Sequence, residues 1–549
     1  MVEKTMSIIK TTQSFLTRNG IKLVSDIYRP NTSEKLPVLL MRQPYGRAIA
    51  STVVYGHPRW YANHGYIVVI QDVRGRGDSE GEFRLFESEI EDGYDTLDWI
   101  ANLEGSNGNV GMYGFSYQGM TQLYAAISQH PALKTICPAM IGYDLYTDWA
   151  YENGAFCYQL NLAWAIQLAA ETARLKRDLP AYKTLYLASR NLPIYDIPIT
   201  VDEALRKYCP SNFYYQWLSN TENNEYWQKL SPKTYFQDID LPMLHIGGWF
   251  DAYLRGTLNL YQEMKTKSKF QQCLIVGVWG HIPWGNTLGS RSFSSFANSN
   301  IDQTQIAWFD KYLKGIENNY LPKENINLFQ MGSNKWITKN NLTNKTNKYL
   351  YLKSTGLANI KDDDGVLLVN NQENNEFQED IIVQDFWRNV PSLGGHSFVP
   401  SGVFKRTELD NRSDIITYTS NFLTEELEII GDIELEIFAQ SDQYSFDLSA
   451  ILSQVFPDGK VYNFTQGHIR ILQNNCEQPI KFKLQPTCIK LEKNTALRLS
   501  ISTTNFPAYL VNTGDKKNYH HSFLNLETTP LTVNIFSGKD KPSKIIFNT

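Results

Sequence analysis

The 549-residue sequence contains few of the patterns that mark membrane, secreted or metal-binding proteins. No run of 18 apolar residues occurs, so we expect no membrane-spanning helix and no membrane partner. The N-terminal stretch lacks the continuous apolar region of a signal peptide, which predicts a cytoplasmic protein. The six cysteines are widely spread without a C-x-x-C pair, so neither a disulfide framework nor a metal site is expected.

Charge and motif content exclude further classes of partner. The net charge is −5 and no basic stretch accumulates, so nucleic acid is not an expected partner. No P-loop or dinucleotide fingerprint occurs, and we expect no cofactor. Aromatic residues, by contrast, make up 13% of the chain, which predicts apolar pockets or extensive β structure.

The chain is too long for one hydrophobic core, and its patterning changes along its length. Buried strands alternate with helices in residues 1–143 and again in 231–324, which predicts an α/β core with a mostly parallel sheet. Residues 144–230 are aromatic and helical, as expected of a cap inserted over the strand ends. In residues 325–549, apolar and polar residues alternate with period two in the strand segments, which predicts a separate all-β jelly-roll domain.

One short stretch predicts a nucleophile. An apolar strand ends at Gly114, Ser116 follows, and a helical pattern begins near Met120. A strained strand–turn–helix with flanking glycines would hold the Ser116 hydroxyl out at the top of the sheet. The spacing G-x-S-x-x-G places Gly119 one residue later than in the usual elbow. Taken alone, the stretch could equally be a plain Gly/Ser turn.

A serine nucleophile needs a base and a group that orients the base. In α/β-hydrolase order both follow the serine, each after a later strand. Asp251 follows an apolar strand at 242–248, and His281 follows another at 273–277. Taken singly, Asp251 could be a helix N-cap and His281 a turn residue, and His245 and His130 are rival bases.

The developing oxyanion needs preorganised hydrogen-bond donors. The backbone N–H of Tyr117 is one candidate because it follows the nucleophile. The other should come from the loop after the strand at 36–41, where Tyr45 offers a hydroxyl. The alternative for Tyr45 is a surface tyrosine in a Pro-Tyr-Gly turn.

These motifs resemble the CocE/NonD family of serine hydrolases, which includes cocaine-esterase-like enzymes, α-amino-acid ester hydrolases and glutaryl acylases and is more distantly related to X-Pro dipeptidyl peptidases. The resemblance runs almost end to end and rests on R-Q-P-Y at 42–45, D-V-R-G-R-G at 72–77, G-F-S-Y-Q-G at 114–119, G-W-F-D at 248–251, G-H at 280–281 and jelly-roll signatures near 412–420, 457–459 and 502–507. It implies a three-domain esterase or amidase. By this resemblance Ser116 is the nucleophile, His281 the base and Asp251 its orienter, with Tyr45 and the Tyr117 amide as oxyanion donors.

The acyl pocket departs from part of that family. α-Amino ester hydrolases have two acidic residues just past the aspartate, and here these positions hold Tyr253 and Leu254. An apolar rim cannot offset the desolvation of an ammonium ion. Tyr253, with Trp149 and Trp164 in the cap, instead predicts an aromatic-lined acyl pocket, although each could be packing of the cap core.

The sequence therefore predicts a serine hydrolase that cleaves esters or activated amides of small-molecule substrates, with an apolar or aromatic acyl group. The alternatives are an X-Pro dipeptidyl peptidase or α-amino-acid ester hydrolase, and a glycan-binding or scaffold protein with an idle hydrolase core. Arg74, Arg76 and Asp78 are interpreted as a structural ion-pair turn. A homodimer is left open.

Overall fold

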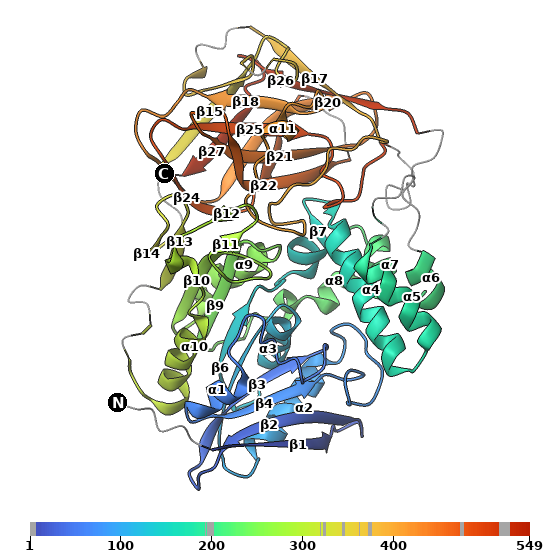
Figure 1. The fold of residues 1–549 in the computed structure, drawn as a ribbon, viewed down its shortest axis with the longest axis vertical. Helices are drawn as coiled ribbons and strands as arrows, with labels where there is room; N and C mark the ends of the chain where they lie inside the picture. Colours follow the sequence, from blue (N-terminus) through green and yellow to red (C-terminus); the bar gives the residue numbers. More distant parts are fainter. Residues whose placement is uncertain are drawn as a thin grey trace.

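The computed structural model describes residues 7–192, 194, 203–318, 320–321, 325–342, 346–361, 363–371, 376–472, 477–514 and 528–548. Figure 1 shows a β-rich C-terminal region above an α/β core, with a group of helices beside the core and below the β-rich region. Cys476 lies outside the described residues, and the other five cysteines are free thiols, four of them buried.

The α/β core is built on a sheet whose described strands run in the order β1-β2-β4-β3-β5-β6-β9-β10-β13-β14. From β4 to β13 neighbouring strands are parallel, whereas β1–β2, β2–β4 and β13–β14 are antiparallel. The strands are β1 (Ile8–Leu16), β2 (Lys22–Pro30), β3 (Leu36–Gln43), β4 (Ile67–Asp72), β5 (Ser106–Phe115), β6 (Leu133–Ala139), β9 (Met243–Phe250), β10 (Gln272–Gly280), β13 (Ile326–Gln330) and β14 (Lys335–Lys339).

Helices cover both faces of this sheet, which is why its central strands are apolar throughout rather than alternating. On β3, Val38 and Leu40 join one core cluster, while Leu39 and Met41 join the other. The core helices are α1 (Pro58–Asn63), α2 (Glu89–Ala101), α3 (Tyr117–Ile127), α9 (Leu254–Lys267) and α10 (Ile301–Phe309), the last continued by η4 (Asp310–Lys314), while η2 (Pro232–Tyr235), η3 (Ser295–Ala297) and the β11 (Thr287–Leu288)–β12 (Arg291–Ser292) pair lie in connections.

The segment between β6 and β9 is the helical insertion expected from its aromatic pattern. Its rings pack on one another, for example Trp217 on Trp227 with centroids 5.4 Å apart. It contains η1 (Tyr146–Ala150), the short pair β7 (Tyr151–Glu152) and β8 (Ala155–Phe156), and the helices α4 (Tyr158–Leu175), α5 (Leu179–Arg190), α6 (Glu203–Tyr208), α7 (Phe213–Ser219) and α8 (Glu225–Leu230).

The C-terminal region is β-rich, as predicted, and the jelly-roll connectivity stays a prediction. Its main described sheet runs β17-β26-β20-β27-β15-β16-β18-β25-β21-β22, with β23 paired to β20 and β19 paired to β24 apart from it. The elements are β15 (Asn347–Lys353), β16 (Val366–Leu368), β17 (Gln378–Gln384), α11 (Thr407–Asp410), β18 (Ile416–Ser420), β19 (Leu427–Gly431), β20 (Ile433–Ser441), β21 (Phe446–Val455), β22 (Val461–Ile471), β23 (Ile480–Lys483), β24 (Thr487–Leu491), β25 (Ala496–Ser502), β26 (Leu531–Ser537) and β27 (Lys544–Asn548).

The first sheet continues along the chain beyond the domain boundary predicted between residues 324 and 325. β13 and β14 follow residue 325, yet β13 pairs with β10 in parallel and β14 with β13. By hydrogen bonding, the first sheet therefore continues to Lys339. The division into four domain segments otherwise stays a prediction.

Candidate active site

Ser116 occupies a strained turn between β5 and α3. Its backbone has φ +60° and ψ −128°, a region that non-glycine residues rarely adopt. Its N–H donates to the Ala139 carbonyl at 3.0 Å and its own carbonyl accepts from the Met120 N–H at 2.9 Å, so both neighbouring elements fix the turn. The structure thus forms the sharp strand-to-helix turn that the glycine spacing predicts.

Two glycines make this turn sterically feasible. A Cβ on Gly114, which has φ +138°, would lie 2.5 Å from the Gln118 Cβ. A Cβ on Gly119 would lie 2.3 Å from Ile141 Cγ2 and 2.7 Å from the Ala139 carbonyl oxygen. The displaced glycine is therefore required by the close approach of α3 to the end of β6, rather than by the turn itself.

Asp251 and His281 are brought together from the carboxyl ends of β9 and β10. His281 Nδ1 lies 2.8 Å from Asp251 Oδ1. The carboxylate is fully buried and also accepts the Tyr253 N–H at 3.1 Å, whereas the imidazole is 32% exposed. This bond fixes the ring with its other nitrogen available, which is the arrangement of an oriented general base.

The imidazole of His281 lies beside the serine turn. The ring of Phe115, which directly precedes Ser116, has its centroid 5.2 Å from that of His281. The rival histidines lie elsewhere. His245 is buried within β9 against Gln272, with its pKa lowered to about 4 by burial, and His130 bonds the Ala132 N–H at the end of α3.

The two predicted oxyanion donors flank Ser116. Tyr117 opens α3, and the first amides of a helix have no intrahelical acceptor, so its N–H is free to donate to a ligand. The hydroxyl of Tyr45 accepts from Trp164 Nε1 at 3.2 Å. Burial raises the pKa of Tyr45 to about 12, while hydrogen bonding with Trp164, the charge of Arg76 and hydrogen bonding with Ser116 oppose the rise. A phenol with this pKa stays a donor at neutral pH.

The three predicted pocket residues form one aromatic wall. Trp149 contacts Trp164 with ring centroids 5.1 Å apart and Tyr253 with centroids 4.2 Å apart. Tyr253 in turn meets the His281 ring edge-on at 5.1 Å. The wall therefore runs from the cap, through Trp164 beside Tyr45, to the candidate base.

Some residues near the site were missed or misread in the sequence. Gln485, from the C-terminal region, donates from Nε2 to the main-chain oxygen of Asp251 at 2.7 Å, and no motif marks it. In the predicted ion-pair turn, Arg74 pairs with Asp92 and Asp78 pairs with Arg47. Arg76 lies in the same turn but takes no part in these ion pairs. Its guanidinium lies over the ring of Phe83 under the cap, so for this residue the ion-pair interpretation is wrong.

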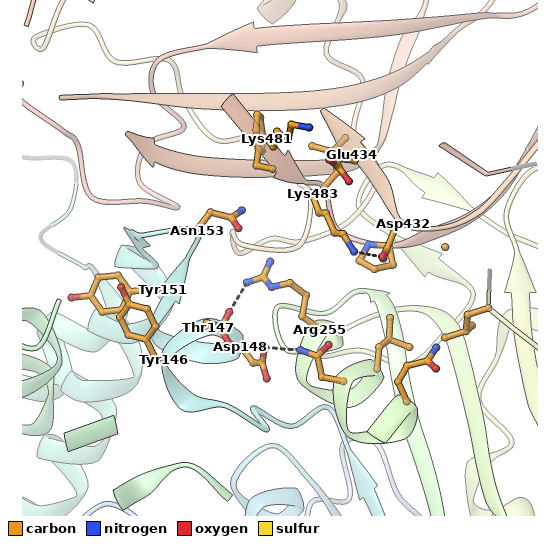
Figure 2. Close-up of a pocket in the computed structure, with 18 of the residues that line it drawn as sticks. Tyr146, Thr147, Asp148, Tyr151, Asn153, Arg255, Asp432, Glu434, Lys481 and Lys483 are labelled. Atoms are coloured by element: carbon orange, nitrogen blue, oxygen red, sulfur yellow. Dashed lines mark hydrogen bonds and ion pairs between the residues drawn. The ribbon is translucent and has the colours of Figure 1, made fainter. Parts of the chain in front are cut away.

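A separate cavity of about 620 Å³ lies between the cap, α9 and the C-terminal region. Figure 2 shows Asp148 beside Arg255 at its base and Asp432 bonded to Lys483 across from them. Burial raises the pKa of Asp148 to about 6, and its carboxylate oxygens already accept from Asn259 and other donors. Ser116 does not line this cavity.

Within the described ranges, no group of three or more metal-ligating side chains comes together, and none of the helices is both long and apolar enough to cross a bilayer. A strained serine beside an Asp–His pair at the carboxyl ends of parallel strands is the arrangement that α/β-hydrolase sites have.

Comparison with known proteins agrees with this class. Residues 19–283 match the family model of the X-Pro dipeptidyl-peptidase (S15 family), and residues 318–545 match that of the X-Pro dipeptidyl-peptidase C-terminal non-catalytic domain. A cocaine esterase from Rhodococcus sp. is 29% identical over 83% of this chain and 81% of its own.

Solved structures share the fold at lower identity. An aminopeptidase from a marine sediment Thaumarchaeota archaeon superposes with a TM-score of 0.82 at 20% identity, covering 100% of this chain and 97% of its own. An α-amino acid ester hydrolase gives 0.79 at 20% identity, with the same coverage. The resemblance to the CocE/NonD family of serine hydrolases that the motifs predict is confirmed, since the two matched models and the cocaine esterase together extend over most of the chain.

Proposed function

We propose that the protein cleaves carboxylic esters or activated amides through an acyl-enzyme on Ser116, and that its substrates are small molecules. The observation that carries this is the 2.8 Å bond between His281 and Asp251, beside the strained Ser116 turn. The cytoplasmic location and the option of a homodimer are retained as predictions.

In the proposed reaction, His281 Nε2 takes the Ser116 proton while the serine oxygen bonds to the substrate carbonyl carbon. The carbonyl oxygen becomes an oxyanion, which the Tyr45 hydroxyl and the Tyr117 N–H stabilise. Collapse breaks the bond to the leaving alcohol or amine, which receives the proton from the imidazolium. Water then attacks the acyl-enzyme with His281 as base, releasing the acid and restoring Ser116.

The aromatic wall supports an apolar or aromatic acyl group. Trp149, Trp164 and Tyr253 pack ring against ring, and Tyr253 lies edge-on to His281, which places apolar side chains beside the candidate base. An α-amino substrate would need a free carboxylate there. Asp148 accepts three hydrogen bonds or more and Glu152 is paired with Arg255, so neither supports binding of an ammonium group.

The decisive experiment is hydrolysis of p-nitrophenyl acetate and butyrate by the wild type and Ser116→Ala. We expect turnover to fall by on the order of 10⁴-fold or more, with the melting temperature within a few degrees. Ser128→Ala, at the far end of α3, is the matched control and should retain activity. A fluorophosphonate probe should label Ser116 stoichiometrically; labelling of another residue would contradict the assignment.

A comparison of two substrates distinguishes the proposed function from the X-Pro peptidase and α-amino-acid ester hydrolase alternatives. The p-nitrophenyl esters of phenylalanine and of 3-phenylpropionic acid differ only in the ammonium group. We expect the neutral ester to have the higher kcat/KM because no unpaired acid among the described residues faces the aromatic wall. A preference for the α-amino ester would instead favour an α-amino-acid ester hydrolase or an X-Pro peptidase.

A further inference from the structure

A second, larger cavity adjoins the aromatic wall. The loop at 75–87 and the cap helices α4, α7 and α8 enclose about 950 Å³. Phe213 lines this cavity and meets Trp164 with ring centroids 5.2 Å apart. Phe83 also lines it, and its ring lies 6.1 Å from that of Tyr117. The cavity is therefore separated by one aromatic side chain from Trp164, which contacts the Tyr45 hydroxyl, and by another from the ring of Tyr117.

Arg76 lines this cavity as a buried cation. Only 1% of the residue is exposed, and its guanidinium carbon lies 3.7 Å from the centre of the Phe83 ring. Its Nη1 donates to the Leu168 carbonyl at 3.2 Å and to Thr172 Oγ1 at 3.1 Å on α4. Burial lowers the pKa of Arg76 to about 10, which still leaves it charged at neutral pH.

The charge of Arg76 is not matched by a neighbouring acid. Within the part of the chain that the structure describes, it forms no ion pair, and its buried Nε has no hydrogen-bond partner. The four acids that line the cavity or lie on α4 pair with other arginines: Asp78 with Arg47, Glu82 and Glu87 with Arg84, and Glu171 with Arg174. A buried cation in this state is costly by several kcal/mol unless a ligand compensates it.

The geometry of the guanidinium indicates the ligand. Nη1 is engaged by α4, whereas the buried Nε has no hydrogen-bond partner among the described residues, so the edge that carries Nε is the one whose hydrogen bonds a ligand could complete. A planar guanidinium edge matches the two oxygens of a carboxylate, which it binds with parallel hydrogen bonds. A neutral group would leave the charge uncompensated.

We propose that Arg76 anchors a carboxylate-binding subsite, so that the enzyme takes esters or amides carrying a carboxylate remote from the scissile bond. This rests on the function proposed above. Trp164 contacts the Tyr45 hydroxyl, and Leu168 lies one helical turn further along α4, a rise of about 6 Å. The carboxylate therefore binds several bonds away from the reacting carbonyl.

The test compares matched substrates. One series consists of p-nitrophenyl monoesters of dicarboxylic acids of increasing length, each against its methyl-capped neutral counterpart. A second places the carboxylate on the leaving group, using acetylated 3- and 4-hydroxybenzoate against their methyl esters. In the wild type, one series should show a higher kcat/KM for the charged member, and which one does so assigns the subsite to the acyl or the leaving-group side.

The same ratios are then measured for variants. Arg76→Met should lower the charged-to-neutral ratio by about 10- to 100-fold, mainly through KM, because a charge-assisted pair is lost. Arg76→Lys should retain part of it. Arg190→Met, which removes an exposed arginine of the cap helix α5 outside the cavity lining, should leave the ratio unchanged. A wild type without preference, or an Arg76→Met variant that slows both members equally, would overturn the subsite.

Two controls keep the outcome interpretable. Turnover of neutral p-nitrophenyl butyrate tests the proposed function itself, so its absence is distinguished from the absence of carboxylate preference. If Arg76→Met does not fold, inhibition of the wild type provides the measurement: the free dicarboxylic acid from the preferred length should compete with the neutral ester more strongly than its diamide does. Equal inhibition by both would exclude the subsite.

Discussion

Gln485 holds the loop of Asp251 from outside the α/β core: its Nε2 donates to the Asp251 main-chain oxygen at 2.7 Å. A second contact lies close by, since a Cβ on Gly280, the residue before His281, would lie 2.3 Å from Ser401 Oγ. The C-terminal region thus packs directly against both segments that supply the Asp–His pair. In this protein it is a structural support for the site as well as an attached domain.

Gln485→Ala should lower kcat without a matching change in KM. Loss of one hydrogen bond, worth about 0.5–1.5 kcal/mol, corresponds to roughly a 2- to 10-fold effect if it loosens the acid loop. The control is Gln384→Ala, which removes a buried glutamine that bonds the Asn512 carbonyl within the C-terminal region. Equal loss of kcat in both variants would show a general effect of destabilisation instead.

Tyr45→Phe should reduce kcat by on the order of 10²–10³-fold, because it removes one of two oxyanion donors. The matched control is Tyr113→Phe, since the buried Tyr113 hydroxyl has no hydrogen-bond partner among the described residues. Steady-state kinetics with p-nitrophenyl butyrate provide the measurement. A loss of only a few-fold would remove Tyr45 from this role.

Gly119→Ala should destabilise the protein by about 1–3 kcal/mol, because the added methyl group meets Ile141 and the Ala139 carbonyl. Gly93→Ala is a contrasting test in another core helix. There the methyl group would lie 3.4 Å or more from Ala125 and Arg42, so the substitution should stabilise the helix by about 0.5–1 kcal/mol. Thermal unfolding midpoints measure both, and a neutral Gly119→Ala would contradict the packing argument.

Glu152 joins the cap to α9 and to the C-terminal region, and we expect its contribution to the stability of the fold to depend on pH. It pairs with Arg255 and His396, both at 2.9 Å, and accepts from the Tyr509 hydroxyl at 2.6 Å. Burial raises the pKa of Glu152, but the charges of Arg255 and His396 outweigh burial, so the pKa lies below the ordinary 4.5. A lowered pKa means that the stabilisation is fully present above pH 4.5 and is lost progressively as the pH falls from there through the folded-state pKa.

Glu152→Gln should therefore lower the melting temperature strongly at pH 7, because breaking a buried pair costs about 3–5 kcal/mol. The difference from wild type should shrink as the pH falls below 4.5. Glu82→Gln, which breaks the exposed pair with Arg84, should change little at either pH. A deficit that is the same at pH 7 and pH 4 would contradict the charge-based explanation.

The sequence alone determined the α/β core, its inserted helices and its β-rich C-terminal region, because buried strands, amphipathic helices and half-buried strands differ in period. It also determined which residues follow which strand, so Ser116, Asp251 and His281 could be proposed before any distance was known. The Asp251–His281 bond agrees with that proposal, since parallel strands end at one edge of the sheet.

Tertiary structure decided what depends on contacts between distant segments. The sequence could not show that β13 and β14 extend the first sheet, that Gly119 is required by Ile141, or that Gln485 supports the Asp251 loop. It grouped Arg76 with its charged neighbours, whereas packing under α4 separates it from them. Such partners are set by where a side chain is desolvated and what surrounds it there, and neither is encoded in local spacing.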